Sequence, residues 1–213
     1  MSTTPRKTDR RTLYTRQVVK DALLELLENN TFDKINVTAV CKQAEITRAT
    51  FYLHFTDLNE VLDEVIQEAL EIAEHSGGDE DYGTRRALLM RTLKNGPEAL
   101  KGNERLLAPC QRIADHPKYK ALFMDDSLAY YIIRKIYLAE RGETIPALMK
   151  QCRVSEEDAD RLFMFMIYGL YYVNRSLRWE KSDDWYRMQY LVNYLLENGL
   201  DSVSALPADY KKA

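Results

Sequence analysis

The chain has 213 residues, of which 46% are hydrophobic and 30% are charged, and its formal net charge is −3. This length can bury one medium-sized core or two smaller ones. With only 8 Gly and 6 Pro, the composition excludes collagen-like, disordered and turn-rich all-β chains and favours an all-α fold. The longest apolar stretch, residues 162–173, is shorter than the roughly 18 to 20 residues of a spanning helix, so no membrane partner is expected.

The N-terminus is polar and basic and lacks the apolar segment of a secretory signal. The cysteines, Cys41, Cys110 and Cys152, are odd in number and far apart, which argues against a disulfide framework. Both observations predict a cytoplasmic protein with reduced thiols.

Positive charge is concentrated towards the N-terminus. Residues 1–56 carry 9 basic and 6 acidic side chains, whereas residues 57–213 carry 21 and 27. A basic segment on an acidic body indicates a polyanionic partner for one end of the protein. Charge alone leaves a solvated tail as the alternative.

The first elements expected along the chain are four helices. Apolar residues at intervals of three and four predict a helix over residues 13–27 and another from 58 to about 74, opened by Thr56 or Asp57. Between them, Thr38 is expected to cap a short helix over 37–44 and Thr47 to cap one over 48–55, with a tight turn at 45–46. The spacing of these segments predicts a helix-turn-helix.

A cluster of glycines and acids at 76–83 is the clearest break in the sequence and predicts a domain junction or loop. Beyond it, we expect helical segments at 84–94 and 118–141 and a short one from Pro146 to Arg153. Two strong helices close the chain. The first is capped by Ser155 and runs to about Trp179, and the second is capped by Ser182 and stops at Gly199.

The helix-turn-helix segment ends in the run Thr-Phe-Tyr-x-His-Phe at residues 50–55, directly after a turn and the capping Thr47. This segment resembles the DNA-binding signature of the TetR family of bacterial transcriptional regulators, and the resemblance extends from about Arg10 to Val65. It implies a flexible basic arm (1–9), a DNA-binding domain (10–56), a connecting helix (57–75) and an effector-binding and dimerisation domain (76–213). It also implies a homodimeric repressor that leaves a palindromic double-stranded DNA operator when a small molecule binds, in the bacterial cytoplasm at the nucleoid.

A recognition helix presents its N-terminal residues to base edges, and Arg48 is suited to bidentate bonding with guanine. In matching positions of the family, Tyr52 and His54 contact phosphates, although packing and capping roles remain alternatives for these two. The predicted DNA-binding residues are Arg10, Arg11, Thr15, Thr38, Lys42, Thr47, Arg48, Ala49, Thr50, Tyr52 and His54.

Two positions depart from the family pattern. Glu45 occupies the turn position where the family usually has Gly, so it must accept a positive φ or shift the turn. Leu58 stands where a phosphate-contacting Lys is common. The alternative hypothesis is therefore a helix-turn-helix used for protein interaction, with weakened DNA binding.

The C-terminal body offers two further predictions. The last two helices are rich in aromatic residues and are expected to form a four-helix dimer seam. The residues predicted there are Phe165, Tyr171, Tyr172, Tyr186, Tyr190 and Tyr194. An effector pocket, with hydrophobic core as the alternative role, is predicted from Met90, Phe123, Tyr130, Tyr131, Tyr137, Met164 and Tyr168. The acidic balance of residues 57–213 favours a neutral or cationic effector.

An enzyme is the other class considered. His54, His75 and His116 lack metal-ligand spacing, and no nucleophile-elbow, zincin or phosphate-loop motif occurs. Acid pairs at 156–157 and 183–184 lie at predicted helix starts, where capping explains them. We therefore expect no catalytic activity, no cofactor and no metal.

Overall fold

The computed structural model describes residues 7–77, 80–113, 116–207 and 209, and these form helices without any strand. The predicted all-α fold is confirmed. None of the helices in these ranges combines the length and apolar character needed to cross a membrane. The chain divides into two compact units, residues 1–69 with 121–129, and residues 70–120 with 130–213. The chain passes from one unit to the other within helices, first between residues 69 and 70, and not at the glycine-rich segment 76–83.

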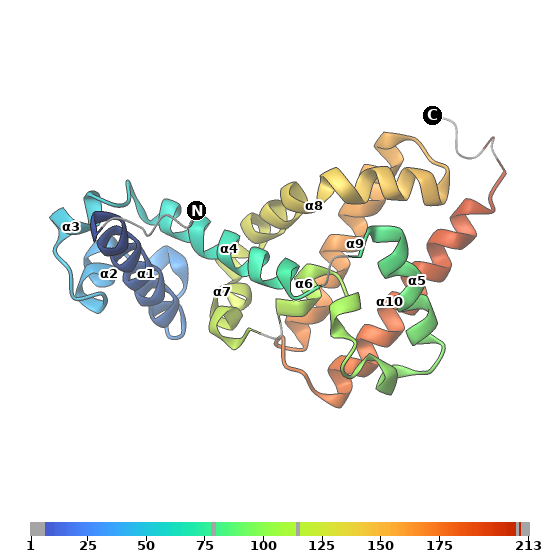
Figure 1. The fold of residues 1–213 in the computed structure, drawn as a ribbon, viewed down its shortest axis with the longest axis horizontal. Coiled ribbons are helices and arrows are strands. Elements are labelled where there is room, and N and C mark those ends of the chain that lie inside the picture. The colour runs from blue at the N-terminus through green and yellow to red at the C-terminus, as the bar shows by residue number, and fades with distance from the viewer. Residues whose placement is uncertain (1–6, 78–79, 114–115, 208, 210–213) are drawn as a thin grey trace. The chain divides into compact units, whose positions relative to one another are not determined.

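The first unit contains four helices and a return segment (Figure 1). Their bounds are α1 (Lys7–Leu27), η1 (Phe32–Lys34), α2 (Val37–Gln43), α3 (Arg48–Tyr52), α4 (Leu58–His75, which ends in the second unit), α7 (Lys120–Met124, whose first residue belongs to the second unit) and η6 (Asp126–Leu128). Phe51 and Phe55 are buried between these helices, and their ring centroids lie 5.7 Å apart. This core fixes α3 because both aromatic residues point to the same side of the chain, four residues apart.

Caps define the short helices of the first unit. The Thr47 hydroxyl accepts a hydrogen bond from Thr50 N at 3.0 Å, as predicted. The predicted cap of α2 is wrong, because Asn36 Oδ1 accepts from Ala39 N at 2.9 Å and Thr38 lies inside the helix. Asn and Asp compete well with Thr at this position, so the cap lies two residues closer to the N-terminus.

The return segment brings residues 121–129, predicted to belong to the effector-binding body, into the first unit. Phe32 N donates a hydrogen bond of 2.6 Å to Asp125 Oδ2, and Asp125 Oδ1 accepts from Ser127 N. Phe123, two residues before Asp125, is completely buried. A distant part of the chain therefore completes this unit.

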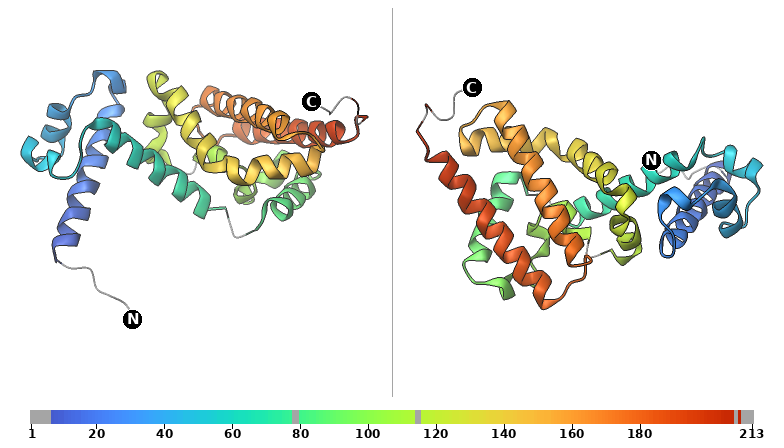
Figure 2. Two further views of the ribbon diagram at one scale, coloured as in Figure 1. Left: turned by 90° about the horizontal axis from the view of Figure 1, so that it is seen from above. Right: turned by 180° about the vertical axis from the view of Figure 1, so that it is seen from behind.

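The second unit is built around three long helices (Figures 1 and 2). Its elements are α5 (Tyr82–Leu93), η2 (Pro97–Leu100), η3 (Glu104–Leu106), α6 (Pro109–Arg112), η5 (Pro117–Tyr119), α8 (Ala129–Cys152, whose first residue belongs to the first unit), α9 (Glu156–Ser176) and α10 (Asp183–Ser204). The side chains of Ser155 and Ser182 cap α9 and α10 as predicted. Trp185 is fully buried in a cluster with leucines of α5, η2 and η3.

Two predicted breaks are wrong. Pro146 lies inside the continuous helix α8, which bends along its length (Figure 2), and the residue four positions before it is Gly142. A proline ring clashes with the carbonyl four residues earlier, and bending relieves that clash. Gly199 lies inside α10, which continues to Ser204 because Leu200 is buried against the unit.

Buried amides join three helices of the second unit. Asn174 Oδ1 accepts from Trp185 Nε1 at 2.9 Å and from Gln189 Nε2 at 3.0 Å. Gln189 Oε1 in turn accepts from Gln111 Nε2 at 2.7 Å. Because unsatisfied buried polar groups are costly, this network specifies how α6, α9 and α10 pack.

Arg112 caps the C-terminal end of α4 from inside the second unit. Its guanidinium, almost fully buried, donates to Ala73 O and Glu74 O on α4 and to Leu107 O at 2.6 Å. The last carbonyls of a helix lack intrahelical donors and carry partial negative charge. A buried cation therefore stabilises the end of α4.

Candidate nucleic-acid interface and ligand pocket

Helix α3 buries one side and exposes the other. Phe51 is buried, whereas Arg48, Ala49 and Tyr52 are exposed, together with the capping Thr47. Arg48 Nη2 lies 3.4 Å from Tyr52 Oη, and the guanidinium carbon lies 5.9 Å from the centre of the Tyr52 ring. The exposed side of α3 thus presents hydroxyls, an aromatic ring and a guanidinium to solvent.

Arg16 of α1 holds the end of α3 in place. Its guanidinium lies 4.2 Å from the centre of the Phe55 ring, donates to His54 O and pairs with Glu64 of α4. The paired carboxylate raises the pKa of Arg16 through a side-chain hydrogen bond. One side chain therefore fixes α1, the end of α3 and α4 relative to one another.

Glu45 adopts a φ of 52°, one of the two outcomes that the sequence predicted for this turn. An L-residue in this region is strained by on the order of 1 kcal/mol. The side chain is exposed, so a carboxylate lies in the turn that precedes α3. Leu58, the second departure, is the first residue of α4 and is half-buried.

The remaining predicted contacts lie on several elements of the first unit. Arg10, Arg11, Thr38 and Lys42 are all exposed. Thr15 Oγ1 donates to Arg11 O within its own helix at 2.9 Å. Three predicted contacts are half-buried: Thr15, Thr50 and His54. In the predicted arm, residues 7–9 are helical, and residues 1–6 lie outside the described residues.

The structure brings together four of the seven predicted effector-pocket residues. Tyr130, Tyr137, Met164 and Tyr168 line an open groove between α8 and α9. The other three are elsewhere: Met90 packs against the Trp185 cluster, Phe123 lies in the core of the first unit, and Tyr131 stacks with Lys135 of its own helix. These residues were predicted because most of them are aromatic. Their positions along the helices, however, place their side chains on different faces.

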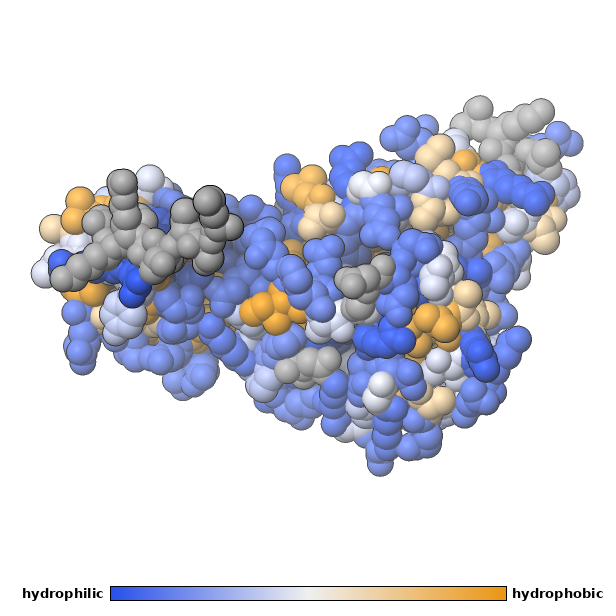
Figure 3. All heavy atoms as spheres, in the orientation of Figure 1, coloured by the Kyte–Doolittle hydropathy of each residue, from blue (hydrophilic) through white to orange (hydrophobic). Residues whose placement is uncertain are grey.

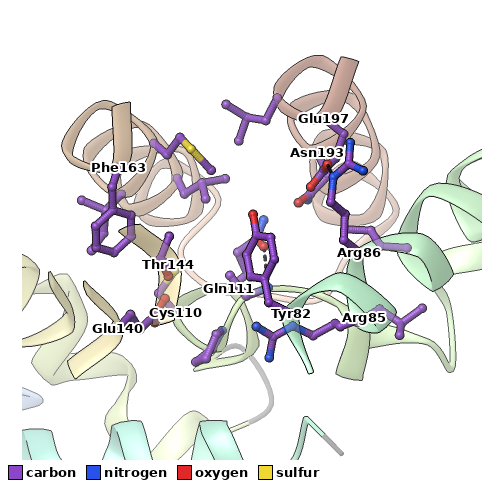
Figure 4. A pocket seen from close by; sticks show the side chains of 18 residues that line it. Tyr82, Arg85, Arg86, Cys110, Gln111, Glu140, Thr144, Phe163, Asn193 and Glu197 are labelled. Atoms are coloured by element: carbon purple, nitrogen blue, oxygen red, sulfur yellow. Dashed lines mark hydrogen bonds and ion pairs between the residues drawn. The ribbon is translucent and has the colours of Figure 1, made fainter. Parts of the chain in front are cut away.

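A more enclosed pocket lies between the helices of the second unit, with a volume of about 90 Å³ (Figure 4). Apolar side chains form much of its wall, including Phe163, Ile167 and Leu170 of α9 and Leu89 of α5. The polar groups that line it come from four helices: Tyr82, Arg85, Arg86, Cys110, Gln111, Glu140, Thr144, Asn193 and Glu197. None of the predicted effector residues is among the lining residues.

At one end of this pocket the charges are paired. Arg86 forms ion pairs with Glu197 and, at 2.6 Å, with Asp201 of α10. Burial still raises the pKa of Glu197, although Arg86 opposes the shift. Burial raises the pKa of Tyr82 to about 12, so its phenol is protonated at neutral pH.

Glu140 of α8 lies at the other end. Its Oε1 is shielded from solvent and has no hydrogen-bond partner among the described residues. Burial raises the pKa of this carboxyl to about 7, while Arg85 and Arg112 act on it from a distance and lower it. Buried carboxyls with raised pKa values are typical of ligand and functional sites.

The predicted dimer residues divide into exposed and buried groups. Phe165, Tyr172 and Tyr194 are exposed, and Tyr186 and Tyr190 are half-buried. Tyr171 is only 1% exposed and packs against Trp179, so its assignment to a dimer surface is wrong. Because apolar and aromatic residues occupy nearly every position from 162 to 173, the sequence alone did not separate the side of this helix facing the core from the side facing solvent.

A long apolar groove runs between α9 and α10, with a volume of about 420 Å³. Its residues repeat one spacing on both helices: Leu162, Phe165, Met166, Gly169, Leu170 and Val173 on α9, and Val192, Leu195, Leu196, Gly199, Leu200 and Val203 on α10. A Cβ added to Gly169 or Gly199 would meet no atom within 4 Å. The matching spacing was present in the sequence and identifies the exposed apolar face that aromatic content alone missed.

Helices α9 and α10 lie nearest the viewer in the right view of Figure 2. Figure 3 is drawn from the other side, and there hydrophilic side chains predominate while hydrophobic ones form small, separate patches. Phe165 and Leu195, each 70% exposed, belong to the α9–α10 groove. Large exposed apolar surfaces of this kind mark interaction sites.

Comparison with models of protein families gives no match to this chain, and comparison with characterised proteins gives none either. Within the described ranges, no cluster of three or more His, Cys, Asp or Glu side chains could hold a metal ion. The functional assignment therefore depends on the geometry of α3, of the α9–α10 groove and of the pocket.

Proposed function

We propose that this protein is a sequence-specific DNA-binding transcriptional regulator of the TetR type, which represses transcription and leaves its operator when a small molecule binds. The observation that carries the proposal is the exposed side of α3, where Arg48 and Tyr52 stand beside the capping Thr47. The exposed polar groups on this side match what a recognition helix offers to the major groove.

Arg48 is the proposed specificity residue. Its guanidinium, held beside Tyr52 by a hydrogen bond, can bond bidentately to the O6 and N7 atoms of guanine. Exposed cations on neighbouring helices, Arg10, Arg11 and Lys42, are suited to phosphate contacts, which supply affinity without sequence information.

The active form is proposed to be a homodimer joined through the α9–α10 groove. Two copies of this groove can interlock, because the open space at Gly169 and Gly199 admits large side chains such as Phe165 and Leu195 of the partner. No charged residue lines the groove, so pairing two copies buries no charge. A two-fold dimer matches a palindromic operator, whose half-sites lie about 34 to 36 Å apart or at multiples of that spacing.

Selection of bound duplexes from a random pool by the purified protein, at about 0.1 M salt, tests the proposal. We expect an enriched palindrome that Arg48→Ala no longer enriches. Lys34→Ala is the matched control, since Lys34 is an exposed cation of η1 outside the helix-turn-helix. Enrichment by this control must equal that of the parent.

A protein-interaction module is the second candidate, and exposed Glu45 in the turn before α3 favours it. A carboxylate there repels phosphate. If the folded, dimeric protein enriches no sequence and its duplex binding does not weaken with added salt, this second function replaces the first, because phosphate contacts always produce salt dependence.

A further inference from the structure

The pocket of the second unit has two different ends. Acidic side chains form ion pairs at one end, and a carboxylate oxygen at the other lacks a hydrogen-bond donor in the described part of the chain. At the α10 end, Glu197 and Asp201 both pair with Arg86. At the α8 end, no hydrogen-bond donor of the described residues reaches Oε1 of Glu140. Figure 4 shows the two ends on opposite sides of the Tyr82 ring.

A buried carboxylate oxygen without a donor is unstable, and a ligand that supplies the donor recovers the lost interaction. Thr144 lies one helical turn after Glu140 on α8 and also lines the pocket, so a hydroxyl acceptor stands on the same side. An ammonium group has three donors and no acceptor, which suits a carboxylate beside a hydroxyl. Residues 57–213 have more acidic than basic side chains, which disfavours an anion.

The remaining walls define the other end of the ligand. Phe163, Ile167 and Leu170 of α9 present apolar side chains to the pocket. Its volume of about 90 Å³ is smaller than the roughly 150 Å³ of an apolar cavity that binds benzene. A short hydrocarbon chain therefore fits, with its charged end towards Glu140.

We infer that this pocket binds small primary amines, whose ammonium group is held by the Glu140 carboxylate and whose hydrocarbon chain contacts the apolar wall of α9. The inference rests on the proposed function only in naming these amines as the class of effector that releases the protein from DNA. Binding of the amine itself requires no DNA.

Three molecules with the same chain and different head groups test the inference: n-butylamine, n-butanol and butyrate. Their dissociation constants for the full-length protein can be measured by ligand-observed NMR at pH 8. We expect n-butylamine to bind at least tenfold more tightly than n-butanol, and butyrate to bind most weakly. Glu140→Gln should abolish the preference for the amine, because an amide carries no charge.

Glu143→Gln is the matched control. Glu143 is an exposed acid on the same helix and does not line the pocket, so its loss changes the net charge equally and should leave the tenfold preference intact. If Glu140→Gln does not fold, Glu140→Asp keeps the charge on a shorter side chain and should keep the preference with weaker binding.

Equal binding of amine and alcohol by the parent protein would overturn the inference. So would tighter binding of butyrate that is lost in Arg85→Gln, because the pocket would then select anions. Failure of the regulator proposal looks different, since the folded protein would bind n-butylamine but no operator. If the protein binds both n-butylamine and the operator, but the amine does not lower the affinity for the operator, the pocket binds amines but they are not the effector.

Discussion

In the first unit, the cations that join helices remain partly in water, whereas the second unit combines ion pairs of this kind, such as Arg86 with Glu197, with polar groups that are fully buried. Arg16 and Lys20 keep 25% and 15% of their side-chain surface exposed while they pair with acids of α4. Arg112 and Asn174 are 1% exposed and are satisfied by hydrogen bonds within the second unit. Charge near water is available to a polyanion and is screened by salt, while buried polar groups fix one arrangement of helices at a high cost if a partner is lost.

The largest effect is expected from Arg112→Met. Methionine has similar length but no donor, so the carbonyls of Ala73 and Leu107 would lose hydrogen bonds inside the second unit. Each buried acceptor left unsatisfied costs about 1 to 3 kcal/mol, and we expect a loss of about 3 kcal/mol or more in the free energy of unfolding in urea. Arg91→Met, at an exposed position of α5, should change it by less than about 0.5 kcal/mol.

If Arg112→Met unfolds no more easily than Arg91→Met, the guanidinium is not what holds the end of α4. The statement that buried polar groups hold the second unit together would then be wrong for Arg112.

The pH dependence of stability tests Glu140, a buried acceptor of the second unit without a hydrogen-bond donor at Oε1 among the described residues. Burial raises the pKa of Glu140 to about 7, with Glu74 of α4 and Glu143 of α8 adding to the shift and Arg85 of α5 and Arg112 of α6 opposing it. An unfolded Glu titrates near 4.3, so between that pH and about 7 the folded chain binds more protons than the unfolded chain. The contribution of Glu140 to the free energy of unfolding therefore falls as pH rises through this window.

Glu140→Gln removes this titration. At about 1.4 kcal/mol per pH unit, the difference in unfolding free energy between Glu140→Gln and the parent should shift by about 2 to 3 kcal/mol in favour of the variant from pH 5 to pH 8. Urea titrations of both proteins across this range measure it. A difference that does not change with pH would mean that the carboxyl is already satisfied in the folded protein.

The sequence predicted best those features that depend on interactions between residues close together in the chain. Thr47 caps a helix by accepting from a donor three residues away, and Phe51 meets Phe55 across one turn, so a short stretch contains the whole pattern. The positive φ of Glu45 was one of two outcomes that followed in the same way from a single position. The cap at Asn36 was missed because two nearby candidates compete, which local pattern does not resolve.

The pocket was not predictable by the same means. Tyr82, Cys110, Glu140, Phe163 and Asn193 come from five elements, and nothing in their spacing along the chain marks them as neighbours. Its formation depends on the tertiary packing of α5, α6, α8, α9 and α10. The α9–α10 groove was predictable only in part. The repeated spacing of its residues can be read from each helix alone, but their exposure depends on how the helices pack.

Arg48→Ala tests the exposed side of the first unit. Loss of a bidentate contact to guanine should weaken binding to the selected operator by about 1 to 3 kcal/mol and relax the preference at that base pair. Unfolding should be unaffected, because Arg48 is exposed and its hydrogen bond to Tyr52 is long at 3.4 Å. Gel-shift titrations with the selected duplex measure the change, and unchanged affinity would remove Arg48 from the interface.

The smallest effect is expected for the pair between Lys20 Nζ and Glu68, which lie 2.5 Å apart and join α1 to α4. A double-mutant cycle with Lys20→Met and Glu68→Gln should give a coupling of about 0.5 to 1 kcal/mol at low salt, because both groups retain contact with water. At about 1 M salt, where the screening length is about 3 Å, the coupling should fall by half or more. The penalty of Arg112→Met should stay nearly constant over the same range, since salt does not reach its buried hydrogen bonds. Equal salt dependence of the two would show that the second unit admits water where the structure buries its polar groups, and the difference between the units would be one of degree only.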